Sequence, residues 1–126
     1  MNYLLDTHAI LLYAQGNQEL SQKAKAIMEN EQCFYSIASF WEIAIKQKLG
    51  KLDNALTILE LEELCKNSGF VQLPTRSQYV ENTKSLDFIH RDPFDRLLIS
   101  IAQCEDLTIV TRDTIIPKYN NVKTVW

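Results

Sequence analysis

Short apolar runs alternate along this chain with segments in which apolar residues recur every three or four positions. Buried strands are typically short continuous apolar runs, whereas amphipathic helices show a period of 3.6 residues. Strands are predicted at residues 2–5, 33–37, 70–73, 108–111 and 122–126. Helices are predicted at residues 9–14, 21–30, 39–49, 57–67, 76–86 and 92–105, with a further short helix opening at Asp113.

Residues with special backbone preferences mark several of these boundaries. Gly16 and Asn17 break the first predicted helix, and Gly50 is a stop signal after the third. Asp92 followed by Pro93 is typical of a helix start, with an N-cap acid before proline at the first helical position. Strands that alternate with helices predict a central, mainly parallel sheet of four or five strands in a three-layer α/β/α sandwich.

The length of 126 residues fits one domain, residues 1–126, around a single core. The opening segment has no basic stretch and no long apolar run, so neither a signal peptide nor a membrane span is expected. Three cysteines lack any metal-ligand spacing: Cys33, Cys65 and Cys104. They are expected to be small buried residues in a reducing environment, which predicts a cytoplasmic protein.

The formal net charge of −3 counts against a nucleic-acid partner, because phosphate binding usually leaves a basic footprint. However, four of the 16 acidic residues belong to the candidate site described next, and the remaining twelve face 13 Lys and Arg. Several of these cations stand near the candidate motifs, among them Lys46, Arg91, Arg96 and Arg112. The charge therefore does not exclude a nucleic-acid substrate.

Four acids from distant parts of the chain are predicted to converge. Asp6 and Asp113 come just after predicted strands, and functional groups of open parallel sheets collect beyond the carboxyl ends of the strands. Glu42 lies three residues after Ser39 on one face of the third predicted helix, so both side chains can point toward the same site beyond the carboxyl ends of the strands. Asp95 lies in the first turn of the last long predicted helix.

Four converging carboxylates repel one another, and a divalent cation would relieve this repulsion. Since no His or Cys stands at ligand spacing, the ligands are hard oxygens, which select Mg²⁺ or Mn²⁺. Such ions assist phosphoryl transfer by polarising the phosphodiester and stabilising the leaving oxygen. Hydrolysis of nucleic acid is therefore the predicted class of reaction.

Each acid also has a purely structural alternative. Asp92 and Asp95 could cap a helix, as its N-cap and N3 residues, and Asp113 could cap likewise. The alternative for Asp6 is a turn role, and for Glu42 it is a solvated helix position. Which of Asp92 and Asp95 would contact a metal is left open.

Other polar residues could support these acids. Three hydroxyl residues lie within three positions of one of them: Thr7, Ser39 and Thr111. They could orient carboxylates, or they could only cap the local backbone. Arg96 could hold a substrate phosphate or form a salt bridge to the acids. His8 and His90 are too isolated for a zinc site and are expected to have turn or packing roles.

Several motifs together resemble one known family. They are Leu4-Leu5-Asp6-Thr7-His8, Ser36-x-x-Ser39-x-Trp41-Glu42-Ile43-Ala44-Ile45-Lys46 with Leu49-Gly50-Lys51-Leu52, His90-Arg91-Asp92-Pro93-Phe94-Asp95-Arg96-Leu97-Leu98, and Val110-Thr111-Arg112-Asp113 with Trp126. In this order and over nearly the whole chain, they resemble the PIN-domain proteins of the VapC group, which are the ribonuclease toxins of type II toxin–antitoxin systems.

The resemblance implies a PIN fold and an endoribonuclease that depends on Mg²⁺ or Mn²⁺. The family's four acids would fall on Asp6, Glu42, Asp95 and Asp113, and its hydroxyl partners on Ser39 and Thr111. The resemblance also implies an RNA substrate, a homodimer and a small antitoxin whose C-terminal segment wraps the groove. Apolar residues of the helices between Ser39 and Cys65 would suit dimer and antitoxin contacts.

Two other interpretations compete with this one. The first is a non-catalytic α/β binding or regulatory module with an acidic pocket, such as a receiver-like domain. Receiver sites need paired acids after the first strand and a lysine after the last, whereas here only Asp6 follows the first strand and Arg112-Asp113 follows a late one. The second is a DNA-directed nuclease of similar architecture, which usually needs additional helices that 126 residues hardly accommodate.

Overall fold

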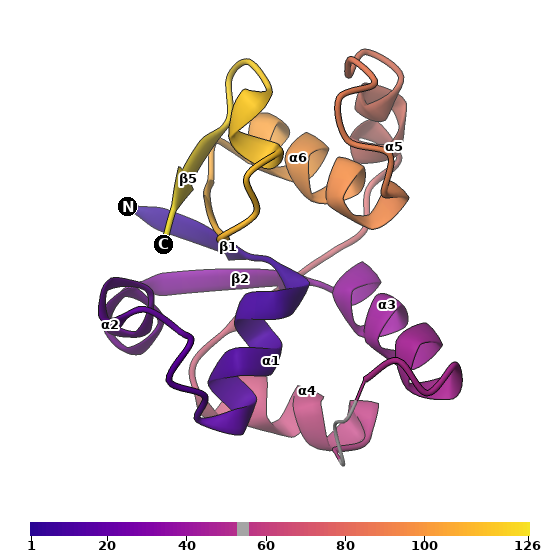
Figure 1. Cartoon of the computed structure of the whole chain (residues 1–126). Helices are drawn as coiled ribbons and strands as arrows, with labels where there is room; N and C mark the ends of the chain where they lie inside the picture. Colours follow the sequence, from indigo (N-terminus) through magenta and orange to yellow (C-terminus); the bar gives the residue numbers. More distant parts are fainter. Residues whose placement is uncertain (53–55) are drawn as a thin grey trace.

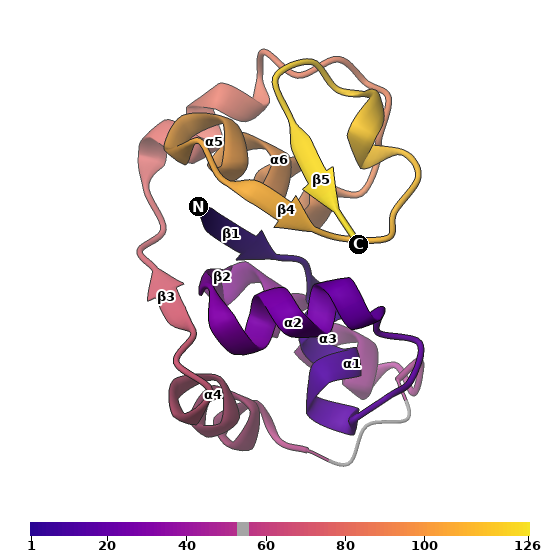
Figure 2. The same cartoon turned by 90° about the vertical axis from the view of Figure 1, so that its left-hand side faces the viewer.

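The computed structural model describes residues 1–52 and 56–126; the single-domain prediction also covers residues 53–55, which lie outside the described part. Its centre is a sheet of five parallel strands in the order β3-β2-β1-β4-β5. The strands are β1 (Asn2–Leu5), β2 (Gln32–Ser36), β3 (Val71–Leu73), β4 (Thr108–Val110) and β5 (Lys123–Val125). Figure 2 shows β1 in the middle of the sheet and β5 at one edge, as the sequence predicts for the last strand.

Helices cover both faces of this sheet. They are α1 (Thr7–Gln15), α2 (Gln22–Asn30), α3 (Ile37–Lys48), α4 (Ile58–Asn67), α5 (Ser77–Thr83) and α6 (Pro93–Glu105), with a 3₁₀ helix η1 (Ile116–Lys118) before β5. In Figure 1, α1 to α4 lie on one side of the sheet, and α5 and α6 lie on the other. The predicted three-layer α/β/α sandwich is confirmed.

The side chains of β1 alternate between the two layers, as the period of two in a strand requires. Tyr3 and Leu5 belong to the core formed with α1 to α4, which includes Ile10 and Phe40. Leu4 belongs to the opposite core, which α5, α6 and η1 share. After the exposed Asn2, both faces of β1 are buried, which is why the strand continues with Tyr3, Leu4 and Leu5.

Two helices begin earlier than the sequence pattern predicts, because a polar residue caps each of them directly after a strand. Asp6 accepts a 2.7 Å hydrogen bond from the amide of Ala9, so α1 begins at Thr7 rather than at Ala9. The hydroxyl of Ser36 accepts from the amide of Ala38, so α3 begins at Ile37, a residue predicted to end the strand. Conversely, the short helix expected at Asp113 begins only at Ile116 and is 3₁₀ in form.

The order of the strands fixes where a site can form. The chain fills the sheet from β1 to β3 in one direction and then adds β4 and β5 on the other side of β1. The carboxyl ends of β1 and β4 are therefore neighbours, and the amide of Asp6 donates to the carbonyl of Val110 at 3.2 Å. Such a switch point is where open α/β sheets bind their ligands. Among the described residues, no helix combines the length and apolar character that crossing a bilayer would require.

The two-sided burial of β1 predicts that Leu4→Ala and Leu5→Ala are about equally damaging. Both side chains are fully buried, each in a different core, so each substitution is expected to lower the free energy of unfolding by about 2–5 kcal/mol. Leu59→Ala, at a side chain that is 77% exposed, should change it by less than about 0.5 kcal/mol. Urea denaturation followed by circular dichroism measures all three. A mild effect of either β1 variant would contradict the two-layer packing.

Candidate active site

A pocket of about 280 Å³ opens where α1, α3, α6 and the segment after β4 meet. It is lined by Asp6, Thr7, His8, Leu11, Glu42, Lys46, Leu52, Asp92, Asp95, Arg112 and Asp113. The structure thus brings together all four candidate acids and, in addition, Asp92. A larger hollow of about 680 Å³ beside the end of α1 is lined by a single acid, Glu29. The carboxylates are therefore concentrated in the smaller pocket.

Asp6 is the most enclosed aspartate of the pocket, at 6% exposure. It follows β1 directly and caps α1 through one carboxylate oxygen, Oδ1. Burial raises the pKa of Asp6, although hydrogen bonds from the Thr111 side chain and the Ala9 amide favour its ionised form. The turn role that the sequence leaves open for Asp6 takes the form of a helix N-cap, and the same side chain also lines the pocket.

Glu42 is held by two partners of opposite kinds. The hydroxyl of Thr7 donates to Glu42 Oε1 at 2.6 Å, and Lys46 Nζ lies 2.9 Å from Glu42 Oε2, one helical turn along α3. The hydrogen bond and the charge of Glu42 raise the pKa of Lys46, which keeps its ammonium charged. Thr7 therefore orients a carboxylate, and Lys46 supplies a counter-charge in the pocket wall.

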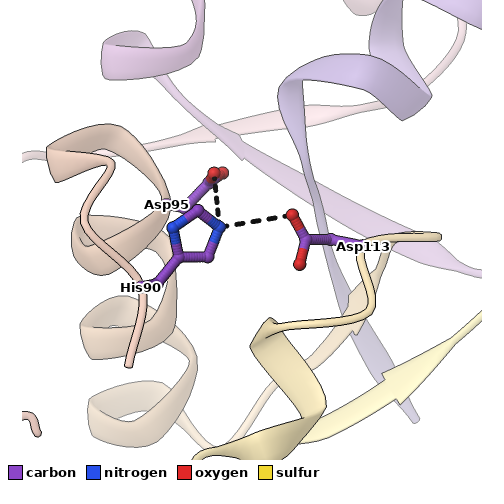
Figure 3. A group of neighbouring side chains, drawn as sticks. All are labelled: His90, Asp95 and Asp113. Carbon is purple, nitrogen blue, oxygen red and sulfur yellow. Dashed lines mark hydrogen bonds and ion pairs between the residues drawn. The ribbon is translucent and has the colours of Figure 1, made fainter. Parts of the chain in front are cut away.

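A compact group is formed by His90, just before α6, Asp95, in the first turn of α6, and Asp113, after β4. Figure 3 shows the imidazole of His90 between the two carboxylates. His90 Nε2 lies 3.0 Å from Asp95 Oδ2 and 3.2 Å from Asp113 Oδ2. One potential ligand atom of each residue lies within 4.8 Å of the others, a spacing that suits a single metal ion.

The two aspartates of this group have opposite pKa shifts. Burial, followed by the charge of Asp92, raises the pKa of Asp95 from 3.8 to about 7. Burial also disfavours the ionised form of Asp113, but hydrogen bonds from the amides of Ile115 and Ile116, together with His90, outweigh it and lower the pKa. The pocket therefore contains one carboxyl group that resists ionisation beside one that is readily ionised.

Asp92 and Asp113 also cap local backbone. Asp92 is the N-cap of α6 and accepts from the amide of Phe94 at 2.8 Å. Asp113 accepts from Ile115 and Ile116 through Oδ1, while its Oδ2 faces His90. Asp95, in contrast, directs Oδ2 at His90 from the first turn of α6. Asp92 and Asp113 thus each cap the local backbone and line the pocket at the same time.

The remaining predicted residues differ in their relation to the pocket. Thr111 is buried beside Asp6, and its hydroxyl also accepts from the amide of Asp113. Ser39 is buried on α3 one turn before Glu42, and its hydroxyl has no hydrogen-bond partner among the described residues. Both lie behind the lining of the pocket rather than in it.

Arg96 lies outside the pocket lining altogether. Its guanidinium donates to the backbone carbonyls of Thr83, Leu86, Asp87 and His90 and stacks over the ring of Phe88 at 4.4 Å. Arg96 therefore lies in the first turn of α6, and its guanidinium binds the end of α5 and the segment between α5 and α6 rather than the acids. No ion pair between Arg96 and the five acids is found among the described residues.

Sequence reasoning did not find the roles of His90 and Lys46. His90 was expected to pack or turn, yet its ring reaches the acids across the start of α6. The available signal was its position two residues before Asp92, in the motif that holds two of the five acids of the pocket. Lys46 could have been found from its place four residues after Glu42, a spacing at which helical ion pairs form.

A parallel α/β sandwich with the four acids Asp6, Glu42, Asp95 and Asp113 together at its switch point is the arrangement that the resemblance to PIN domains implies. The PIN domain family matches residues 3–122, and the chain belongs to this family. The resemblance predicted from the sequence motifs is thus confirmed. No curated protein matches the sequence at a significant level.

Solved structures of low sequence identity share the fold over almost the entire chain. VapBC2 from Rickettsia felis, bound to a DNA fragment from its promoter, has a TM-score of 0.73 at 14% identity, covering 99% of this chain and 98% of the other. A toxin–antitoxin complex from Klebsiella pneumoniae gives 0.67 at 18% identity, with coverages of 98% and 96%. FitAcB from Neisseria gonorrhoeae gives 0.59 at 18% identity, with coverages of 100% and 97%.

The raised pKa of Asp95 predicts a pH-dependent effect of Asp95→Asn on stability. The folded state holds the proton of Asp95 up to about pH 7, whereas an ordinary aspartate loses it near 3.8, so this group stabilises the fold at low pH and its contribution is lost as pH rises toward 7. Asn carries no charge at any pH. In EDTA, the melting temperature of Asp95→Asn relative to the natural chain should therefore rise by a few degrees between pH 5 and pH 8.

Asp106→Asn is the matched control, because Asp106 ends α6 at a side chain that is 93% exposed. Its difference from the natural chain should stay flat over the same pH range. If the melting temperature of Asp95→Asn relative to the natural chain stays constant or falls between pH 5 and pH 8, the pKa of Asp95 is not raised in the folded state.

Proposed function

We propose that this chain is a Mg²⁺- or Mn²⁺-dependent endoribonuclease that acts as the toxin of a toxin–antitoxin pair. The observation that carries the proposal is the convergence of five carboxylates in one pocket at the switch point of a PIN-domain sheet. Membership of the family supports a nuclease, because PIN domains are generally nucleases. The toxin role is supported by structural neighbours that were solved as toxin–antitoxin complexes.

The donor set fits a hard divalent cation. Carboxylate oxygens dominate the pocket, and ligand atoms of Asp95 and Asp113 lie within the range of one ion. The pocket also contains more negative charge than its own cations neutralise, which favours a bound cation. Such an ion would supply charge stabilisation to a phosphodiester and help an attacking water to lose its proton.

The side chains of the protein have distinct tasks in this proposal. Asp6, Asp95 and Asp113 would hold the cation from three segments of the chain. Glu42, which Thr7 and Lys46 hold in place, would add a further negative charge to the lining of the pocket. Positive groups at the same pocket, Lys46 and Arg112, would draw the phosphates of RNA toward the acids.

Cleavage of RNA by the purified chain is expected to require both the metal and Asp6. With total RNA, Mg²⁺ should support cleavage and EDTA should abolish it. Asp6→Asn should reduce the rate on the order of 100-fold, the scale on which loss of one charge-stabilising group slows catalysis. Asn keeps the N-cap of α1, so the variant should fold normally. Gel analysis of labelled RNA measures the rate, and Asp106→Asn is the control that should retain it.

The same assay separates the competing functions. Single-stranded DNA of the same sequence should remain intact if the substrate is RNA, and its preferential cleavage would favour the DNA-directed nuclease. Cleavage that survives in EDTA and in Asp6→Asn would reject the mechanism. A well-folded chain that binds Mg²⁺ and cuts neither polymer would favour the non-catalytic module.

We further propose that α3 carries an assembly surface. Ile37, Trp41, Ile45 and Leu49 are spaced four residues apart and are partly or largely exposed, and we call them the α3 stripe. The ring of Trp41 meets Phe94 of α6 edge-on at 5.6 Å, which extends the apolar surface onto α6. Exposed apolar residues gathered on one face favour a protein contact, and we assign this one to a second copy of the chain. An antitoxin would then cover the acidic groove.

The assembly proposal predicts that Trp41→Glu dissociates a homodimer. A charge in the α3 stripe would have to be buried on association, which is unfavourable without a partner. Light scattering coupled to size exclusion should show the natural chain as a dimer and Trp41→Glu as a monomer. Val80→Glu, at an exposed position of α5, should remain dimeric. A monomeric natural chain would assign the α3 stripe to a different partner.

A further inference from the structure

We propose that His90 is a positioning residue that holds Asp95 and Asp113 together by donating one shared hydrogen bond, and that it is not itself a metal ligand. This inference rests on the proposed function, since it concerns how the same site is prepared for a divalent cation. Its basis is the arrangement of groups around the two nitrogens of the imidazole ring.

The two ring nitrogens face groups of opposite character. The amide of Asp92 donates to Nδ1 at 3.3 Å, so Nδ1 acts as an acceptor. In a neutral imidazole the single hydrogen then resides on Nε2. Nε2 faces two carboxylate oxygens, Asp95 Oδ2 at 3.0 Å and Asp113 Oδ2 at 3.2 Å. A donor between two acceptors satisfies all three groups.

A metal-ligand role would need the opposite tautomer. To bind an ion through Nε2, the ring would present a lone pair there and carry its hydrogen on Nδ1, against the amide hydrogen of Asp92. This would replace the hydrogen bond at Nδ1 by a contact between two donors. The spacing of the three side chains alone would allow Nε2 either to bind an ion or to donate a hydrogen bond. The hydrogen bond from the Asp92 amide to Nδ1 favours the second role, in which Nε2 is the donor.

The backbone of His90 is fixed by contacts on the side away from the pocket. The amide of His90 donates to the hydroxyl of Tyr119 at 2.6 Å. Arg96 Nη1 donates to the carbonyl of His90 and to the same hydroxyl, both at 3.3 Å. His90 is buried, with 9% exposure, so its ring has little freedom to leave the two acids. This network also explains why the guanidinium of Arg96 faces backbone carbonyls rather than phosphate.

The benefit of such a residue is electrostatic. Asp95 is on α6 and Asp113 follows β4, and when both carboxyl groups are ionised their like charges push these two segments apart. A hydrogen-bond donor shared by both keeps their oxygens near each other before a cation arrives. Partners that orient metal-binding carboxylates in this way typically contribute 10–100-fold to metal affinity.

The tautomer of His90 gives the direct test. Nuclear magnetic resonance of ¹⁵N-labelled protein distinguishes a protonated from an unprotonated ring nitrogen, and His8 serves as the internal reference. The hydrogen of His90 is expected on Nε2 both in EDTA and with saturating Mg²⁺. A hydrogen on Nδ1 in either state, or direct coordination of Nε2 when Mg²⁺ is added, would overturn the proposal.

Substitutions test the consequence for metal binding, measured by calorimetric titration with Mg²⁺. His90→Gln retains an amide donor near the position of Nε2, so its affinity should stay within about threefold of the natural chain. His90→Phe keeps a ring without a donor and should bind about 10-fold more weakly. Equal affinities of the two variants, whether reduced or unchanged, would contradict a role as donor.

A milder pair of variants covers the case in which His90→Phe does not fold. Tyr119→Phe removes the hydroxyl that holds the backbone of His90, and it should weaken Mg²⁺ binding several-fold. Tyr79→Phe removes a hydroxyl bonded to Glu105, at the C-terminal end of α6 and away from Asp95, and it should have no effect. Equal effects of the two would count against the proposed network.

The outcomes separate this inference from the proposed function. A natural chain that binds Mg²⁺ and cleaves RNA, but whose affinity is insensitive to His90, would refute the role of His90 alone. A natural chain that neither binds Mg²⁺ nor cleaves RNA would refute the nuclease, while the tautomer would still decide whether His90 is a donor to the two acids.

Discussion

Repulsion among five carboxylates in one small pocket is the constraint that the rest of this structure has to meet. The sheet order creates it, because the ends of β1 and β4 are neighbours and α3 and α6 begin nearby. Several protein groups reduce its cost: backbone amides that bind Asp6, Asp92 and Asp113, the ammonium of Lys46, and the imidazole of His90. These groups offset the charge only in part, because the pocket is lined by five carboxylates and by only two Lys or Arg side chains, Lys46 and Arg112.

Helix and turn starts provide much of this compensation. An aspartate at a helix N-terminus accepts amide hydrogens and lies at the positive end of the helix dipole, so it tolerates burial better than an isolated carboxylate. Each capping aspartate uses Oδ1 for the backbone. In Asp113 the other oxygen, Oδ2, faces His90. One aspartate side chain therefore caps the backbone and lines the pocket at the same time.

The sequence predicted the parallel sheet, its flanking helices and the convergence of the acids, because apolar periodicity and strand ends are local signals. Element boundaries were less accurate at Thr7 and Ile37, where a capping side chain starts the helix immediately after the strand. The environments of His90 and Arg96 could not be predicted. Both depend on contacts with Tyr119, more than 20 residues further along the chain, and no periodic pattern records such contacts.

The pocket is assembled from segments that leave the ribosome at different times. Asp6, Glu42 and Asp95 are synthesised before Asp113, Tyr119 and the strand β5, whose Val125 carbonyl accepts a hydrogen bond from the amide of Thr111. A nascent chain that ends before these residues has most of the acids but lacks the edge strand that fixes the segment after β4. During translation the centre would therefore stay incomplete until residues 111–125 have emerged, which would delay any activity until the fold can close around it.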